Sequence, residues 1–123
     1  MSVMTQSLED YLEAVYRLVE EDRPAKVRAV AEMLSVTMPS VVKAIRELKK
    51  LGLVTQKPYA NIELTVKGGR VARQVLNRHK LILKFLMQLG VSRRNADKDA
   101  CLMEHILSAE TIDRIRSYTE HST

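Results

Sequence analysis

The chain has 123 residues, of which 46% are hydrophobic and 28% are charged, and its formal net charge is +5. This composition makes a folded, soluble protein the default, built as one compact unit or two small ones that share a core. No apolar run approaches the roughly 20 residues that cross a membrane, and the start lacks a basic and then apolar signal. The single cysteine excludes an internal disulfide. We therefore expect a cytoplasmic protein with no membrane partner.

Charge is segregated along the chain. Residues 1–25 carry a net charge of −4, residues 26–80 carry +9, and residues 81–123 are neutral. The basic middle is a candidate surface for a polyanion such as DNA, although a solvated charged face is the simpler alternative. A recognisable fold in this region is needed to decide between them.

The first half of the chain predicts three helices in succession. Ser7 can cap a first helix that runs to about Glu21, with Leu8, Leu12, Val15, Tyr16 and Val19 on its apolar side. A short second helix starts near Val27 and ends near Ser35. After the tight turn "SVTM", Pro39 suits the first position of a third helix, which Gly52 ends and whose predicted buried stripe is Val41, Val42, Ile45 and Leu48.

Two short strand-like runs follow, "LVTQ" and "NIELT", separated by the turn "KPYA". They predict a β-hairpin. Helix, helix, tight turn, helix and hairpin is the pattern of a winged helix-turn-helix, whose second motif helix enters the DNA major groove. We therefore expect residues 1–72 to form a DNA-binding domain.

The predicted third helix carries hydroxyl and cationic side chains that its core does not need. Ser40 and Lys43 are the best candidates for contacts with base edges, whereas the longer cations at the rim suit phosphates. For any one lysine, a solvated surface charge is the alternative. The predicted DNA-binding residues are Arg28, Thr37, Pro39, Ser40, Lys43, Arg46, Lys49, Lys50 and Lys57.

The remainder predicts a long helix from Lys67 or Gly69 to about Leu89, a short one over residues 97–108 and a third over residues 108–121. Their apolar stripes exceed what a small winged helix covers, which favours a helical dimerisation domain over residues 73–123; core packing within a monomer is the alternative. DNA readers of this size usually need two half-sites, so we expect a homodimer on palindromic double-stranded operator DNA.

The stretch "ACLMEHIL" contains the only cysteine. On a helix, Cys101, Glu104 and His105 share one face and present thiolate, carboxylate and imidazole together. Asp10 and Glu13 on the first helix and His79 on the long helix are also metal-ligand types. The alternatives are a core cysteine, carboxylates placed by the helix dipole and a satisfied core histidine.

The segments "SLEDYLEAVYRLVEE", "VRAVAEMLSVTMPSVVKAIRELKKLGLV", "IELTVKGGRVA", "NRHKLILKFL" and "ACLMEHILS" resemble, in order and spacing, the diphtheria toxin repressor and manganese transport regulator family. The resemblance covers nearly the whole chain. It implies a homodimer with an N-terminal winged helix-turn-helix and a helical dimerisation and metal-binding region. It also implies divalent iron or manganese as corepressor at promoters of metal-uptake genes.

The same resemblance implies a set of metal ligands. Asp10 and Glu13 match the manganese branch, His79 matches a ligand of both branches, and Glu104 and His105 match the ligand pair "EH". Cys101 stands where the iron branch has cysteine and the manganese branch has glutamate, which makes the site a hybrid.

Two further positions depart from the family. Leu83 replaces a common glutamate, and Asp97 replaces a histidine of the iron branch, so the number of metals per subunit stays open. The chain ends at Thr123 without an SH3-like domain, and no ligand is expected from that domain.

We therefore expect a metal-dependent transcriptional repressor that senses Fe(II) or Mn(II), with Co(II), Ni(II) or Zn(II) as possible ligands in vitro. Aspartate, glutamate and imidazole suit Mn(II) and Fe(II), whereas a thiolate shifts preference toward Fe(II), Co(II) or Zn(II). Metal is expected to tie the first helix to the dimerisation helices and so to fix the spacing of the recognition helices.

The main alternative is a winged-helix regulator that responds to another ligand and whose metal-type residues are structural. A metal-storage or architectural role is another. A metalloenzyme is disfavoured, because the sequence supplies no separate general base and no signature of a substrate pocket.

Overall fold

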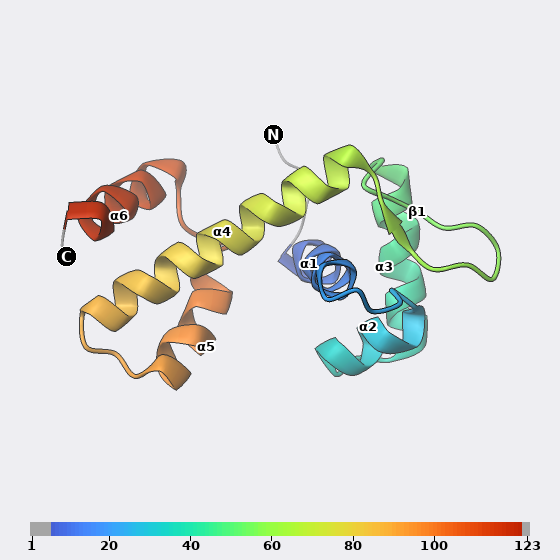
Figure 1. The fold of residues 1–123 in the computed structure, drawn as a ribbon, viewed down its shortest axis with the longest axis horizontal. Coiled ribbons are helices and arrows are strands. Elements are labelled where there is room, and N and C mark those ends of the chain that lie inside the picture. Colours follow the sequence, from blue (N-terminus) through green and yellow to red (C-terminus); the bar gives the residue numbers. More distant parts are fainter. Residues whose placement is uncertain (1–5, 122–123) are drawn as a thin grey trace. The chain divides into compact units, whose positions relative to one another are not determined.

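The computed structural model describes residues 6–121, which form six helices and one two-stranded hairpin (Figure 1). This confirms the expected mainly helical fold with a small β-hairpin. The chain divides into two compact units, residues 1–73 and residues 74–123. In the described part of the chain no helix has both the length and the apolar character needed to cross a membrane.

The first unit contains α1 (Gln6–Glu20), α2 (Val27–Leu34) and α3 (Met38–Lys50). Its core is formed by apolar side chains at helical spacing on all three helices, among them Leu12 and Leu18 of α1, Val30 of α2 and Leu48 of α3. Two details of α1 differ from expectation. Ser7 lies inside the helix, and Leu18 is buried whereas Val19 is 45% exposed.

The turn between α2 and α3 is set by two polar residues. Ser35 adopts a left-handed conformation, with φ of 55°, and its N–H donates to the carbonyls of Ala31 and Glu32, which ends α2. Thr37 caps α3 by accepting a hydrogen bond from the Ser40 N–H. Pro39 occupies the first turn, where its missing N–H has no helical partner to lose. These features fix where α3 begins.

The buried stripe of α3 differs from the predicted one by a residue. Val41, Ala44, Ile45 and Leu48 are buried, whereas Val42 is 44% exposed. Positions i, i+3, i+4 and i+7 lie on one side of a helix, and position i+1 is turned about 100° away from them. The predicted burial of Val42 is therefore wrong, and the exposed face of α3 includes an apolar side chain.

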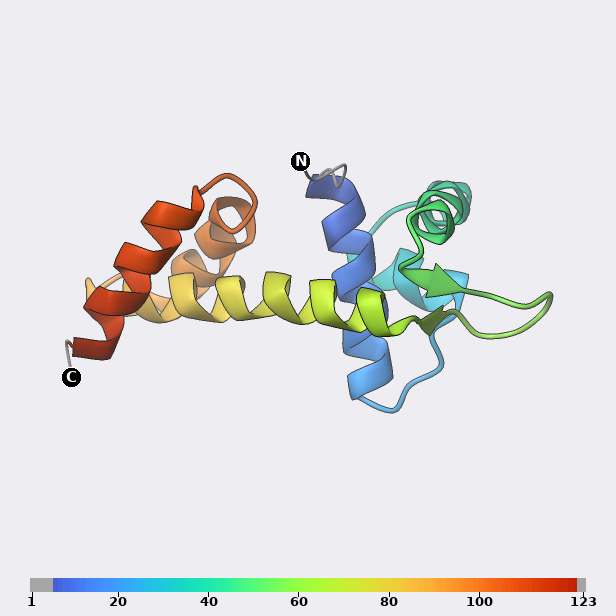
Figure 2. The same cartoon turned by 90° about the horizontal axis from the view of Figure 1, so that it is seen from above.

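The hairpin forms a wing of two short strands, β1 (Val54–Thr55) and β2 (Glu63–Leu64), paired antiparallel with Val54 opposite Leu64. These strands are shorter than the predicted runs. The side chain of Ile62, just before β2, is buried. Its N–H donates a hydrogen bond of 2.8 Å to the carbonyl of Ala25, in the segment between α1 and α2, which anchors the hairpin to the helices. Figure 2 shows the loop between the strands extending well beyond them.

Helix α4 (Val66–Gln88) starts at a tightly packed junction. The Thr65 hydroxyl accepts a hydrogen bond from the Gly68 N–H at 3.0 Å and donates one to the Gly52 carbonyl at 2.7 Å. A Cβ atom on Gly68 would lie 1.9 Å from the carbonyl oxygen of Leu53, whereas one on Gly69 would meet nothing within 4 Å. Only the first of the two glycines is required by packing.

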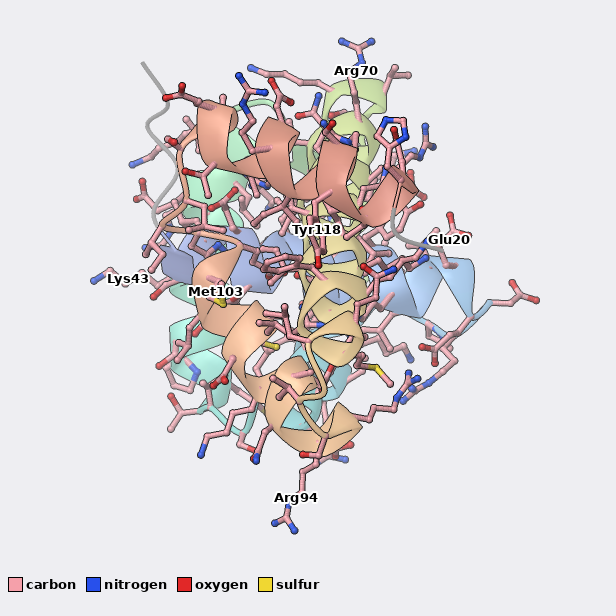
Figure 3. All side chains as sticks on the ribbon, turned by 90° about the vertical axis from the view of Figure 1, so that its left-hand side faces the viewer. Glu20, Lys43, Arg70, Arg94, Met103 and Tyr118 are labelled. Carbon is pink, nitrogen blue, oxygen red and sulfur yellow. The ribbon has the colours of Figure 1, made fainter. Side chains whose placement is uncertain are left out.

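In the second unit, α5 (Arg93–Met103) and α6 (Ala109–His121) pack on the second half of α4 (Figures 1 and 2). Ile82, Ala100 and Ile112, one from each helix, form the centre of this core. Tyr118 of α6, labelled in Figure 3, meets Phe85 of α4 edge to face, with ring centroids 5.6 Å apart.

Helix α5 covers a different segment from the predicted one. It begins at Arg93 because Ser92 caps it by accepting from the Asn95 N–H, and it ends at Met103 instead of Ser108. Glu104 is the C-cap residue, and His105 lies in the turn that follows. The predicted helix therefore ends earlier than expected, although the Glu104 N–H still donates to the Ala100 carbonyl at 3.0 Å as in a helical turn.

Candidate metal centre and DNA-binding surface

The second unit buries a cluster of two imidazoles and one carboxylate. His79 comes from the middle of α4, and Glu104 and His105 come from the turn after α5. Glu104 Oε2 lies 3.0 Å from His79 Nδ1, and Glu104 Oε1 lies 3.3 Å from His105 Nε2. The three side chains are only 5%, 1% and 2% exposed, in the order His79, Glu104 and His105. Burial of three such groups indicates a specific role, because ionisable groups in an apolar core must be paired or bind a cation.

Asp97 of α5 determines which nitrogen of His79 carries a proton. His79 Nε2 lies 2.9 Å from Asp97 Oδ1 and donates a hydrogen bond to it. In the neutral ring Nδ1 is then an acceptor that faces the Glu104 carboxylate. Among the described residues, the buried Nδ1 has no hydrogen-bond partner. Two acceptors 3.0 Å apart in a buried position require a proton or a cation between them.

The protonated form of this contact is reflected in the pKa of His79. The side chain of Glu104 raises the pKa of His79 above its usual value, against the desolvation that lowers it, and Asp97 adds to the increase. A positive charge is thus favoured beside Nδ1, whether it is a proton on the ring or a metal ion.

The donor set fits a divalent first-row metal. Imidazole nitrogen and carboxylate oxygen are ligands that Mn(II), Fe(II), Co(II) and Zn(II) accept. The buried Nδ1 and the carboxylate that it faces are arranged as a pair of metal ligands would be. The residues present therefore fit the metal that the sequence predicts.

The other three predicted ligands lie on α1 and α5. Cys101 lies on α5 with an exposed side chain. Asp10 and Glu13 lie on α1 of the first unit, where Asp10 is half-buried and Glu13 is buried. Glu13 accepts a hydrogen bond from Arg17, one turn along α1, at 2.6 Å. Within the second unit, the structure brings together three of the six predicted ligands, His79, Glu104 and His105.

The nine predicted DNA-binding residues all lie on the surface of the first unit. On α3, Lys43, which is labelled in Figure 3, and Arg46 border a shallow hollow whose apolar floor includes Met38, Pro39 and Val42. Three of the nine residues have local polar partners. The Thr37 and Ser40 hydroxyls are 2.8 Å apart, and Lys50 lies 3.6 Å from Glu47.

Sequence reasoning missed two features of these surfaces. The contact of Asp97 with His79 joins residues 18 positions apart on different helices, and no sequence pattern predicts it. The exposure of Val42 could have been found, because the strict spacing of Val41, Ala44, Ile45 and Leu48 already fills the buried side of α3.

A winged helix-turn-helix followed by a helical unit with a buried histidine and carboxylate cluster defines a class of proteins, the metal-responsive DNA-binding regulators. Comparison with known proteins supports this class. Residues 3–62 match the N-terminal DNA-binding domain of iron-dependent repressors, and residues 65–123 match their metal-binding and dimerisation domain.

Relatives span nearly the whole chain. An uncharacterised helix-turn-helix transcriptional regulator of Methanocaldococcus jannaschii is 39% identical over 119 residues. The matched segment is 95% of this chain and 95% of the relative. The transcriptional regulator MntR of Geobacillus kaustophilus is 38% identical over 117 residues, which are 95% of this chain and 83% of the relative.

Solved structures agree with these relatives. The manganese regulator SloR is 31% identical with a TM-score of 0.83, and a manganese-dependent transcriptional repressor solved with manganese is 27% identical with a TM-score of 0.84. They match 96% and 92% of this chain, which spans only 55% and 52% of their own lengths.

The chain belongs to the diphtheria toxin repressor and manganese transport regulator family of iron-dependent repressors. It is a DNA-binding transcriptional regulator that responds to metal, and it is not an enzyme.

Proposed function

We propose that the protein represses metal-uptake genes with Fe(II) or Mn(II) as corepressor. The observation that carries this proposal is the buried contact of His79 Nδ1 with the Glu104 carboxylate, which favours a positive charge between them. The names of similar proteins add support, since SloR is described as a manganese regulator and the family description refers to iron. Co(II), Ni(II) and Zn(II) are expected to bind in vitro as well.

The proposed ligands are Asp10, Glu13, His79, Cys101, Glu104 and His105. His79, Glu104 and His105 supply the buried part of this set. Asp10 and Glu13 add carboxylates from α1, the helix that packs on the helix-turn-helix motif. Cys101 adds a thiolate from α5. A bound divalent cation supplies positive charge that holds these donors together. Ordering α1 in this way lowers the ordering cost of DNA binding, and by linkage operator DNA tightens metal binding equally.

The proposed DNA-binding domain spans residues 1–72, and the proposed dimerisation and metal-binding domain spans residues 73–123. Within the first, Ser40 and Lys43 are proposed to contact base edges, with Thr37 and Pro39 beside them. Arg28, Arg46, Lys49, Lys50 and Lys57 are proposed to neutralise phosphates, which their exposure permits. A dimer presents two such surfaces, so a palindromic operator in the cytoplasm is the proposed target.

The test is a DNA-binding titration under anaerobic conditions against Mn(II), Fe(II), Co(II) and Zn(II). We expect operator affinity to rise with Fe(II) or Mn(II). Equal affinity with and without either metal would overturn the corepressor proposal.

Cys101→Glu tests the role of the thiolate, because it restores the carboxylate that the manganese branch has at this position. We expect the response to shift toward Mn(II). An unchanged ranking of the four metals would remove Cys101 from the proposed ligand set, and Leu102→Glu, at a neighbouring exposed position, controls for the added charge.

A further inference from the structure

We propose that Asp97 is the positioning residue of the metal centre: its hydrogen bond to His79 Nε2 fixes the ring so that Nδ1 is the metal-binding atom. The inference rests on the proposed metal-responsive function and goes beyond it. It assigns a role to a residue outside the six proposed ligands, and it specifies which nitrogen of His79 binds.

The Asp97 carboxylate lies at hydrogen-bond distance from His79. Asp97 Oδ1 is 2.9 Å from His79 Nε2, within the range of a strong hydrogen bond to a charged acceptor. A carboxylate can only accept, so Nε2 must carry the proton. The neutral His79 ring therefore has its lone pair on Nδ1.

The other ring nitrogen of His79, Nδ1, faces the Glu104 carboxylate. This atom is buried and lies 3.0 Å from Glu104 Oε2, and no described group forms a hydrogen bond with it. The lone pair that Asp97 places on Nδ1 thus points to the one side of the ring where a carboxylate is already buried. Histidine ligands of metals commonly donate their second N–H to a carboxylate, which orients the ring and raises its basicity.

The segment of α5 that carries Asp97 is held firmly by its neighbours. Asp97 lies between Ala96 and Ala100, two fully buried residues that pack α5 onto its unit, and Ser92 caps the same helix. The backbone at Asp97 is therefore held by the core, while its carboxylate is 58% exposed. The side chain can be truncated without opening a cavity, which makes the role testable.

Asp97→Ala is the decisive variant, with Asp99→Ala as its matched control. Asp99 is exposed on the same helix two residues further along, so its loss removes the same charge. Competition with a fluorescent chelator for Mn(II) and for Co(II) should show affinity reduced about 10- to 100-fold in Asp97→Ala. The metal affinity of Asp99→Ala should stay within about threefold of that of the parent protein, because exposed charges are screened by salt. Asp97→Asn, which keeps an acceptor without the charge, should fall between the two.

A second readout does not require metal. Nitrogen-15 NMR of the metal-free protein, at a pH where the His79 ring is neutral, should show the proton on Nε2 in the parent protein and a mixture of tautomers in Asp97→Ala. A proton on Nδ1 in the parent protein would overturn the proposal.

The remaining outcomes are also decisive. Unchanged metal affinity in Asp97→Ala would overturn the proposal, as would the loss of a whole metal equivalent, since Asp97 would then be a ligand itself. If the parent protein bound neither Mn(II) nor Co(II), the proposed function would fail, whereas the NMR result would still decide whether Asp97 sets the tautomer.

Discussion

The two units use polar residues in opposite ways. In residues 1–73 the cations proposed to contact DNA are exposed, and the core consists mainly of apolar side chains, with Glu13 as a buried carboxylate. In residues 74–123 the proposed ligands His79, Glu104 and His105 are inside the fold, beside the packed helices. The proposed DNA contacts are therefore separable from the fold in the first unit, whereas ligand chemistry and fold are coupled in the second. Substitutions of the exposed cations in the first unit should change affinity alone, whereas substitutions of the buried ligands in the second unit should change affinity and stability together.

Glu104→Gln is expected to have the largest effect. It removes the charge that one carboxylate presents to two imidazoles, so Mn(II) affinity should fall by more than the roughly 100-fold expected for loss of an outer partner. Isothermal titration calorimetry measures this, and urea unfolding of the metal-free protein should shift as well. Glu110→Gln, an exposed change in the first turn of α6, is the control. Metal affinity equal to that of the parent protein would contradict the proposed role of the buried cluster in the second unit.

Gly68→Ala should destabilise the first unit by about 3 kcal/mol, because the added methyl group meets the Leu53 carbonyl and not a movable side chain. Gly69→Ala is the matched control. Its methyl group has open space, and replacing a glycine inside a helix should stabilise the protein by about 0.5–1 kcal/mol. Urea unfolding curves of the two variants should move in opposite directions. Equal shifts would show that the close approach at Gly68 is not a constraint.

Lys43→Ala should weaken operator binding by about 1–3 kcal/mol and relax base preference at one operator position. Lys49→Ala should instead weaken binding to all sequences and lower the salt slope by about 1. Both side chains are exposed, so the free energy of unfolding should change by no more than about 0.5 kcal/mol. Fluorescence anisotropy at several salt concentrations measures the binding. A large loss of stability in either variant would contradict the separation of fold and function in this unit.

The smallest effect is expected from pH on the metal-free protein. Glu104 raises the pKa of His79, so the stability from the protonated ring is complete below the unfolded value of about 6.5 and is lost as pH rises through the higher folded value. The free energy of unfolding should therefore decrease above about pH 6.5. Urea unfolding with a chelator present measures this slope, which His79→Gln should reduce. The same slope in both proteins would assign it to other groups.

Much of the fold could be predicted from the sequence because it depends on periodic apolar residues and local capping. The start of α3 at Thr37 and Met38 and the stop at Gly52 follow from such signals. The bounds of α5 did not, since the cap at Ser92 lies outside the apolar pattern that was used to place the helix. The apolar pattern also predicted burial of Val42 and Val19, but both side chains lie beside the buried stripe and are exposed.

The candidate metal centre could be predicted only in part. Residue types indicated His79, Glu104 and His105, but their meeting depends on the packing of α4 against the turn after α5. Helical spacing placed Cys101 with Glu104, but the spacing did not predict that Cys101 is exposed and Glu104 is buried. The partner of Nε2 is a tertiary contact and has no local signal.

The left-handed Ser35 and the Thr37 cap determine the start of α3 without using any side chain of its outer face except the Ser40 hydroxyl. The four buried residues of α3 hold its inner face. The helix is therefore modular. Its outer positions, such as Lys43 and Arg46, can be exchanged for those of another regulator while the frame stays intact. Engineered variants with new operator preferences should be obtainable by grafting that face alone, with the response to metal retained.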